Sequence, residues 1–365
     1  MIPAIPQPDP VPLPAPVWLL WALLLFTFLL HVIAMNLVLG GSLLAAIARV
    51  RSQTGDRPHE ARLAQFFVKA APVLLSATVT FGVAALLFLQ VLYGRVFFAS
   101  AVLMGWWWLG VIPLLVLAYY ASYLLAFREH DLGPAGTILA WLIAAIAGLI
   151  ALIYGNNMTL MLKPQEMVAL YASSGRGLHL NLLDMTLLPR HLHTLCGAIA
   201  VSGMAVAVVA AMHEKEDPDH ARWGIRYGAA VAAVATGLNI FAGMWWLAAL
   251  PRDVMQRFMG QDMTAMVVLL LGILLTITGV GLLLLATASK RAPRTVVVAA
   301  AHLLVGIALM LLTRDTVRAA SLAQAGFQPA NWIMPQWGPI LIFIALLVIS
   351  STSVVWMVRA LARGR

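Results

Sequence analysis

The sequence of 365 residues is too apolar for a protein that folds in water. Apolar side chains make up 62% of it and charged side chains only 10%, whereas water-soluble domains average about 45–50% apolar and about 25% charged residues. A water-soluble enzyme is therefore excluded. Lysine and arginine exceed aspartate and glutamate by 23 to 14. Because most of these charges lie between long apolar runs, we expect them to set membrane orientation rather than to bind nucleic acid.

The cysteine content excludes several kinds of cofactor site. Cys196 is the single cysteine, so the chain cannot form a disulfide framework, an iron–sulfur cluster or a zinc site built from thiolates. It also lacks the C-x-x-C-H motif that attaches haem covalently. Any cofactor must be held by other side chains.

Nine apolar segments are long enough to cross a bilayer, which takes about 20 helical residues. The proline-rich residues 1–16 lack the basic start of a signal peptide and are expected to remain as an outer flank of the first span. The nine predicted spans are 17–48, 70–94, 99–127, 136–161, 191–213, 223–249, 263–288, 293–313 and 338–358. The sequence thus predicts an all-α polytopic membrane protein, with residues 1–365 forming a single integral-membrane domain.

The connections between spans are short, except for residues 162–190 and 315–337. Segment 162–190 mixes aromatic, apolar and charged residues without reaching the length of a span. We expect it to lie along the outer membrane interface.

The distribution of basic residues predicts the orientation of the chain. Fifteen of the 23 lysines and arginines fall on the side of the C-terminus, and the other eight on the side of the N-terminus. The positive-inside rule then places the N-terminus outside and the C-terminus in the cytoplasm. We expect a multi-pass protein of the bacterial inner membrane.

Three histidines within the predicted spans are the main candidates for cofactor ligands, because titratable side chains in hydrocarbon are costly. They are His31 in the first span, His193 at the start of the fifth and His302 in the eighth. At 1.5 Å per residue, His31 lies roughly 20 Å and His302 roughly 18 Å below the outer boundary. This shared depth suits two axial ligands of one haem b. Two unrelated core histidines bonded to backbone would give the same pattern.

His193 lies close to the outer face, where the seventh span begins with Met263 and Met266. The two methionines share one side of a helix, so either could offer a thioether opposite His193, a pairing that tends to raise the reduction potential of a haem. The alternative is ordinary packing, since 17 methionines are spread through the chain.

Several charged side chains are predicted outside the spans. The four arginines expected just beyond the outer helix ends are Arg252, Arg257, Arg314 and Arg318. They either extend to the interface with local ion pairs or form a rim that binds haem propionates and an acidic partner. The histidines expected to be solvated in cytoplasmic loops are His59, His130, His213 and His220.

Five stretches and the last span carry a family resemblance. The stretches are FLLHVIAMNLVLGGSLLAAI, TFGVAALLFLQVLYGRVFF, HLHTLCGAIAVSGMAVA, TAMVVLLLGILL and LLTRDTVRAA, and the last span ends in WMVRALARGR. Together they resemble the haem-bearing large subunit of the cytochrome bd quinol oxidases. The resemblance implies that His31 serves the haem pair where oxygen reacts. It implies that His193 and Met266 bind a low-spin haem b, and that Asp315 and Arg318 lie near a haem edge.

The sequence departs from that family at two functional places. Its third span, FFASAVLMGWWWLGVIPLLVLAYYASYLL, has no glutamate, whereas the family carries haem-binding and proton-delivering glutamates there. The connection PRDVMQRFMGQD is short, where the family has a long quinol-oxidising loop. These two departures argue against oxygen reduction and against a quinol site of the family type. They do not affect the prediction that the chain binds haem b. His302 would then supply a sixth ligand to the haem iron, so that oxygen could not bind there and the haem would be a low-spin electron carrier.

The leading prediction is a membrane haem b subunit, with two haems, of a respiratory quinol oxidoreductase. It would pass electrons between membrane quinone and a periplasmic cytochrome c or iron–sulfur partner, as part of a quinol:cytochrome c-type oxidoreductase. That partner must be a separate protein, because this chain has no ligands for either cofactor. Two alternatives stay open. One is a divergent bd-type terminal oxidase subunit, and the other is a haem-free transporter or scaffold subunit whose histidines only bond across helices.

Overall fold

The computed structural model describes residues 11–129, 131–289, 292–327 and 332–362. Within these ranges the regular structure is helical, apart from one parallel bridge between Leu13 and Ile333. Nine of the described helices are long and apolar enough to cross a membrane. The predicted fold class, an all-α polytopic membrane protein, is confirmed.

Each of the nine predicted spans corresponds to one long helix. These helices are α1 (Val17–Gln53), α2 (Pro58–Leu103), α3 (Gly105–Arg128), α4 (Gly133–Met161), α6 (Leu187–Met212), α7 (Pro218–Ala248), α9 (Met263–Ala286), α10 (Ala292–Gln324) and α11 (Trp337–Ala362). Three short elements lie between them: α5 (Pro164–Ser173), α8 (Arg252–Gln256) and the π-helix η1 (Arg257–Gln261). Proline stands in the first turn of α2, α4, α5 and α7, where its missing N–H costs no helical hydrogen bond.

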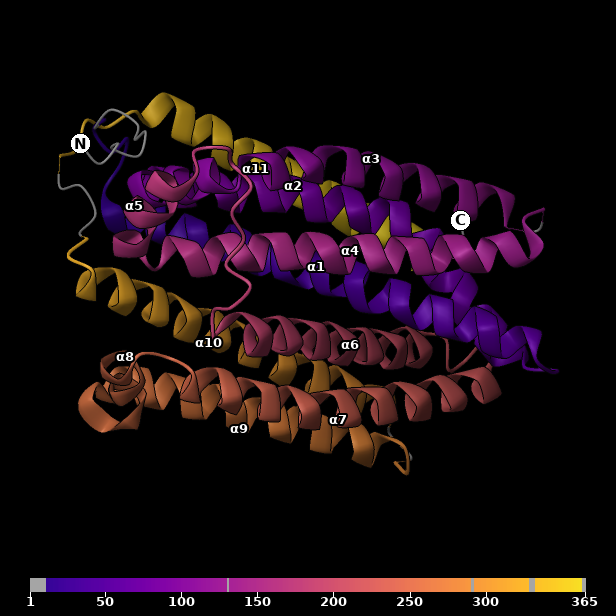
Figure 1. Cartoon of the computed structure of the whole chain (residues 1–365). Coiled ribbons are helices and arrows are strands. Elements are labelled where there is room, and N and C mark those ends of the chain that lie inside the picture. The colour runs from indigo at the N-terminus through magenta and orange to yellow at the C-terminus, as the bar shows by residue number, and fades with distance from the viewer. Residues whose placement is uncertain (1–10, 130, 290–291, 328–331, 363–365) are drawn as a thin grey trace.

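Eight of the long helices form two groups that lie side by side (Figure 1). Helices α1 to α4 make one group, and α6, α7, α9 and α10 make the other. The groups meet mainly where α1 packs on α6. At this contact a Cβ atom on Gly40 of α1 would overlap the carbonyl oxygen of Ala198 in α6. Glycine therefore allows the two backbones to approach closely, as in many membrane helix pairs.

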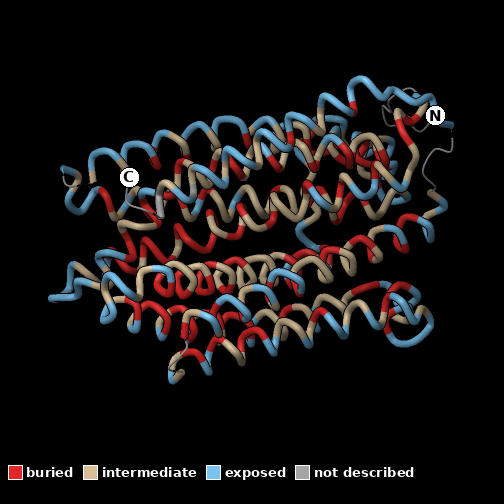
Figure 2. The backbone as a smooth tube through the Cα atoms, turned by 180° about the vertical axis from the view of Figure 1, so that it is seen from behind, coloured by how far each residue is buried: buried red, intermediate tan, exposed pale blue. Residues whose placement is uncertain are grey.

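Buried residues follow the inward faces of the helices, and exposed residues follow the outer faces and the ends (Figure 2). Many buried positions in the second group are alanines, such as Ala207 in α6 and Ala229 and Ala232 in α7. The outward faces are apolar as well and carry side chains such as Phe241 and Leu285. An apolar exterior of this extent suits contact with lipid rather than water.

Helix α11 lies outside the two groups, against α2. The rings of Phe343 in α11 and Phe88 in α2 are 4.9 Å apart. The segment before α11 is tied to the start of the chain, because Leu13 donates a 2.8 Å hydrogen bond to Trp332 and accepts one of 3.0 Å from Met334. We call the end of the molecule that carries α5, α8 and this tie the α5/α8 end (Figure 1).

One expectation about the connections needs correction, and two connections contain helices that the sequence did not predict. Helix α10 continues to Gln324, so Asp315 and Arg318 lie within it and not in a loop. The extension is stable because Val317 and Ala320 are buried against Val254 of α8. Segment 162–190 contains α5 and the first turn of α6. The connection that carries Arg252 and Arg257 is folded into α8 and η1.

Candidate functional site

A hydrogen bond holds His31 against α2, and a glycine in α2 leaves room for its ring. Its Nδ1 lies 2.9 Å from the carbonyl oxygen of Thr78. Because a carbonyl can only accept, Nδ1 carries the proton and Nε2 is left as the unprotonated nitrogen. A Cβ on Gly82 would lie 2.7 Å from the same Nδ1. The ring can therefore lie against α2 only because residue 82 is glycine.

His193 repeats this arrangement in the second group of helices. Its Nδ1 lies 3.0 Å from the carbonyl oxygen of Asn239 in α7. A Cβ on Gly243 would lie 3.0 Å from that nitrogen. In both sites the glycine comes four residues after the carbonyl, one helical turn further along the same face.

The two histidines suit an iron with axial ligands. A metal-binding imidazole typically donates its other N–H to a carbonyl or carboxylate, which fixes the tautomer and the ring. Among the residues that the structure describes, no group of three or more His, Cys, Asp or Glu side chains could hold a bare metal ion. A haem iron takes only one or two protein ligands, so the residues present at His31 and His193 fit a haem.

Beside each histidine lies an aromatic ring, and an arginine lies over that ring. Phe28 stacks near His31, with ring centroids 6.0 Å apart, and the Cζ atom of Arg314 lies 4.7 Å from the centroid of Phe28. On the other side, Trp246 lies 6.1 Å from His193. The Cζ atom of Arg190 lies 4.8 Å from the Trp246 ring. Guanidinium groups over aromatic faces are favourable cation–π contacts.

Arg318 has a carboxylate partner within α10. It is paired with Asp315, and its Cζ lies 4.9 Å from the ring of Tyr93 in α2. Asp315 also accepts a 2.6 Å hydrogen bond from Nε1 of Trp21 in α1. This small network joins α10 to the first group of helices and balances the charge of Arg318.

The remaining predicted site residues lie apart from these contacts. Nδ1 of His302 lies 2.9 Å from the carbonyl oxygen of Val298 in its own helix, and its Cβ faces Gly279 of α9. His31 instead lies against α2, so a shared haem between these two histidines stays a prediction. Met266 lies half-buried in the first turn of α9, and its pairing with His193 also stays a prediction. Arg252 is exposed on α8.

The sequence did not identify several residues of the two histidine sites. Arg190 is one of the eight basic residues counted on the side of the N-terminus, yet it is 8% exposed within α6. The signal was its place three residues before His193, just ahead of the apolar run of the fifth predicted span. Gly243 and the carbonyl of Asn239 were missed because a contact between two helices leaves no mark in the local sequence.

The α5/α8 end also holds a charged cluster around Asp184. This buried carboxylate accepts hydrogen bonds of 2.8 Å from the Thr186 N–H and 2.5 Å from its hydroxyl, and lies 3.0 Å from Nζ of Lys163. Burial by itself raises the pKa of Asp184, but the bonds from Thr186 and Lys163 outweigh it and hold the pKa below the ordinary value of 3.8. For Lys163, burial lowers the pKa, but Asp184 and Glu166 outweigh it and hold the pKa above 10.5.

The expectation that His59 and His220 are solvated in loops is wrong. They lie in the first turns of α2 and α7, and these turns bring their Nδ1 atoms within 2.9 Å of each other. Trp223 stacks on both rings, at 5.2 and 5.7 Å between centroids. His130 lies outside the described residues.

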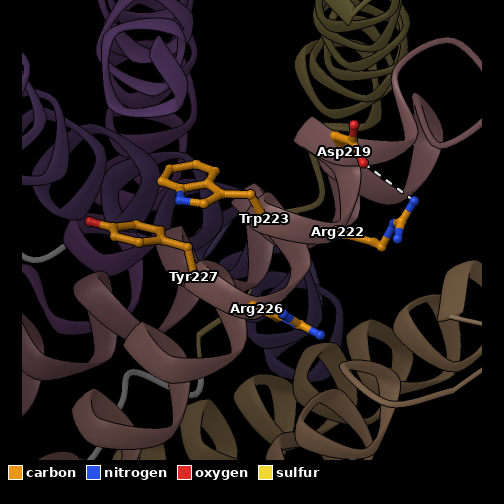
Figure 3. Close-up of a pocket in the computed structure, with 5 residues that line it drawn as sticks. All are labelled: Asp219, Arg222, Trp223, Arg226 and Tyr227. Carbon is orange, nitrogen blue, oxygen red and sulfur yellow. Dashed lines mark ion pairs between the residues drawn. The ribbon is translucent and has the colours of Figure 1, made fainter. Parts of the chain in front are cut away.

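A cavity of about 490 Å³ lies beside this pair, at the end of the molecule opposite α5 and α8. It is lined by Asp219, Arg222, Trp223, Arg226 and Tyr227 of α7. In Figure 3 the rings of Trp223 and Tyr227 lie side by side, and Arg222 turns toward Asp219, 3.3 Å away. None of the three predicted histidine ligands lines this cavity.

Comparisons with known proteins identify a similar fold, but they do not show an activity. No protein-family model and no curated protein matches the sequence. The chain is similar in structure to a chain of the bd oxidase from Geobacillus thermodenitrificans, with a TM-score of 0.71 and 13% identity, over 96% of this chain and 99% of that chain. An identity this low shows a shared architecture and not a shared reaction. The chain thus has the fold of a bd oxidase chain.

Proposed function

We propose that the chain is a haem b-binding membrane subunit of a quinol oxidoreductase with a bd-type fold. The observation that carries the proposal is the repeated arrangement of His31 and His193. In each, Nδ1–H donates a hydrogen bond to a backbone carbonyl and a glycine makes room for the ring. A histidine bonded to a carbonyl always takes this tautomer, as His302 does within its own helix. Two unrelated core histidines would not, however, need a glycine four residues after that carbonyl in both cases.

The residues have separate roles in this proposal. His31 and His193 would hold the haem iron through Nε2, and His302 and Met266 would supply the further ligands expected from the sequence. Arg314 lies over Phe28, which stacks near His31. Arg314 and Arg318 would bind haem propionates, as expected from the sequence, and Arg252 would belong to the outer rim. Haem b supplies a one-electron carrier. The chain's own contribution is to fix the imidazoles, surround them with apolar side chains and exclude water.

We further propose that the electrons come from membrane quinol and leave to a periplasmic cytochrome c or iron–sulfur partner in a bacterial inner membrane. The third long helix, α3, has no acidic residue between Gly105 and Phe127, so it offers no carboxylate for proton delivery to oxygen. This absence favours electron transfer over oxygen reduction. Electrons must then leave to another protein.

The proposal is tested by a visible difference spectrum of the purified protein, reduced with dithionite minus oxidised in air. Pyridine haemochrome counts the haems, and carbon monoxide is added afterwards. We expect two haems b per chain and no response to carbon monoxide. A carbon monoxide shift would reveal an open haem and favour the oxidase alternative. A colourless protein would overturn haem binding altogether.

His193→Ala should remove one of the two haem bands, because Nε2 of His193 is the proposed iron ligand. His191→Ala is the matched control: residue 191 is two positions away, about 200° around the helix, and should leave both bands in place. Equal spectra for the two variants would contradict the ligand assignment.

A further inference from the structure

The cavity at the start of α7 contains a positive charge without a counter-ion. Two arginines line it, Arg222 and Arg226, and their spacing of four residues makes them neighbours on the helix surface. Arg222 is paired with Asp219 at 3.3 Å. Arg226 is exposed and forms no ion pair with the carboxylates that the structure describes. The cavity can therefore take a negatively charged group, for which arginine is a preferred partner.

An aromatic stack forms the other wall of the cavity. The rings of Trp223 and Tyr227 are 5.0 Å apart at an interplanar angle of 13°, and Trp223 also stacks on His59 of α2 at 5.2 Å. In Figure 3 these two rings of α7 point to one side and the guanidinium groups point to the other. Because two helices hold the stack, this wall is formed before a ligand binds, which lowers the entropic cost of binding.

The arginines belong to a face of α7 that is exposed along much of the helix. After Arg222 and Arg226, Ala230 and Val234 follow at intervals of four residues, and all four are exposed. At 1.5 Å per residue, Val234 lies about 12 Å along the axis from Arg226. That depth is within one leaflet, whose hydrocarbon is about 15 Å thick. One lipid molecule on this face can therefore have its headgroup in the cavity and its acyl chain against Val234.

We propose that the cavity binds the phosphate of an anionic phospholipid at the predicted cytoplasmic face of the membrane. Arg226 makes the main contact and Arg222 the second, while Trp223 and Tyr227 lie at headgroup level, where such rings are enriched. Basic pockets on the cytoplasmic side of membrane helices are typical sites for anionic headgroups. The apolar face beyond the cavity favours a lipid over a free phosphate ion.

A zwitterionic lipid suits the cavity less well. Its headgroup carries a cation of its own, which the two arginines would repel. The inference needs no haem, so its test is independent of the proposed function.

The test is native mass spectrometry of the full chain, purified in detergent and mixed with phosphatidylglycerol or phosphatidylcholine of the same acyl chains. We expect the wild type to retain phosphatidylglycerol in preference. Arg226→Gln should lower that preference about fivefold, the usual effect of one basic residue near a membrane surface. Arg128→Gln is the matched control and should keep the preference, because Arg128 is exposed at the same end of the molecule (Figure 1) but does not line the cavity.

Asp219→Asn should act in the opposite direction and raise the retention of phosphatidylglycerol. The substitution releases Arg222 from its ion pair and removes a negative charge that repels the phosphate. A gain of binding cannot result from a damaged fold, so unchanged or lower retention in this variant would contradict the proposal.

Three further outcomes would overturn the inference. Equal retention of the two lipids by the wild type would show that the cavity does not select an anion. Equal losses in Arg226→Gln and Arg128→Gln would show that general surface charge attracts the lipid. Displacement of the lipid by inorganic phosphate would show that the cavity takes a free anion rather than a headgroup.

Discussion

At the scale of single residues, the space beside each histidine matters as much as the histidine itself. Gly82 and Gly243 hold no group that could bind a ligand, yet a methyl group at either position would press on an imidazole nitrogen. The backbone carbonyls behind them belong to ordinary helical turns. The histidine sites therefore depend on a close approach of two helices at one turn.

We predict that Gly243→Ala weakens haem binding at His193 while the protein stays folded. The added Cβ would lie 3.0 Å from both Nδ1 and Cε1 of the ring, so the imidazole must shift by a few tenths of an ångström. Haem content and the position of the low-spin band measure the effect. We expect roughly a tenfold loss of affinity, as for the removal of other groups that orient a ligand.

Gly237→Ala is the matched control on the same helix. A Cβ at residue 237 meets nothing within 4 Å, and alanine is a better helix former than glycine by about 1 kcal/mol. This variant should keep its full haem content and be at least as stable as the wild type. Equal haem loss in both variants would show that α7 responds to any substitution and that the contact with His193 is not special.

The Asp184 cluster gives a prediction about pH. The pKa of Asp184 is lowered in the folded protein, so its stabilising effect is complete above the unfolded value of about 3.9 and is lost as the pH falls through the folded pKa. Hydrogen exchange of residues 163–186, corrected for the intrinsic rate, should show protection at neutral pH that begins to decline below about pH 4 and is lost as the pH falls through the lowered pKa of Asp184.

Asp184→Asn should lose this protection at neutral pH as well. Glu166→Gln serves as the control, because Glu166 is half exposed and 3.3 Å from Lys163, so its loss should matter little. If the asparagine variant keeps the pH dependence of the wild type, another carboxylate is responsible.

At the scale of helices, the contact between α1 and α6 determines how the two groups meet. We predict that Gly40→Ala destabilises the protein by about 1–3 kcal/mol, the usual range for overpacking. Its Cβ would overlap the carbonyl of Ala198 and lie 2.6 Å from Oγ of Ser202. Thermal unfolding in detergent, followed by circular dichroism, measures the change.

Gly148→Ala in α4 is the control for this contact, since a Cβ there has open space. It should unfold at or slightly above the wild-type temperature. An equal loss of stability in both variants would contradict the special role of the close approach at Gly40.

The sequence predicts that the nine long helices exist, but it does not predict where some of them end. An apolar run of about 20 residues identifies a span because lipid leaves few other ways to satisfy the backbone. The end of α10 depends on Val317 and Ala320 packing against α8, and hydropathy contains no information about that contact. For the same reason His31 and His193 could be singled out by residue type, but Arg190, Gly243 and Asn239 needed the packing of α6 on α7.

At the scale of the whole molecule, the uneven distribution of lysine and arginine predicts that the α5/α8 end faces outward. Arg176→Cys and Arg222→Cys, each made in a Cys196→Ser background, place single thiols at opposite ends. A maleimide that cannot cross membranes should label residue 176 in intact cells and should label residue 222 only after the membrane is opened. The reverse pattern would invert the predicted orientation.

The tie between the start of the chain and the segment before α11 has a mechanical consequence. Three backbone hydrogen bonds make this tie, because Gln336 also donates to Pro14 at 2.8 Å, while the membrane-crossing window of α11 has only 6% of its residues buried within the protein. If the C-terminus were pulled, α11 would unwind first against lipid. The load would then pass through these three bonds to the segment that leads into α1, so that further extraction would have to break the tie or pull on the first helix.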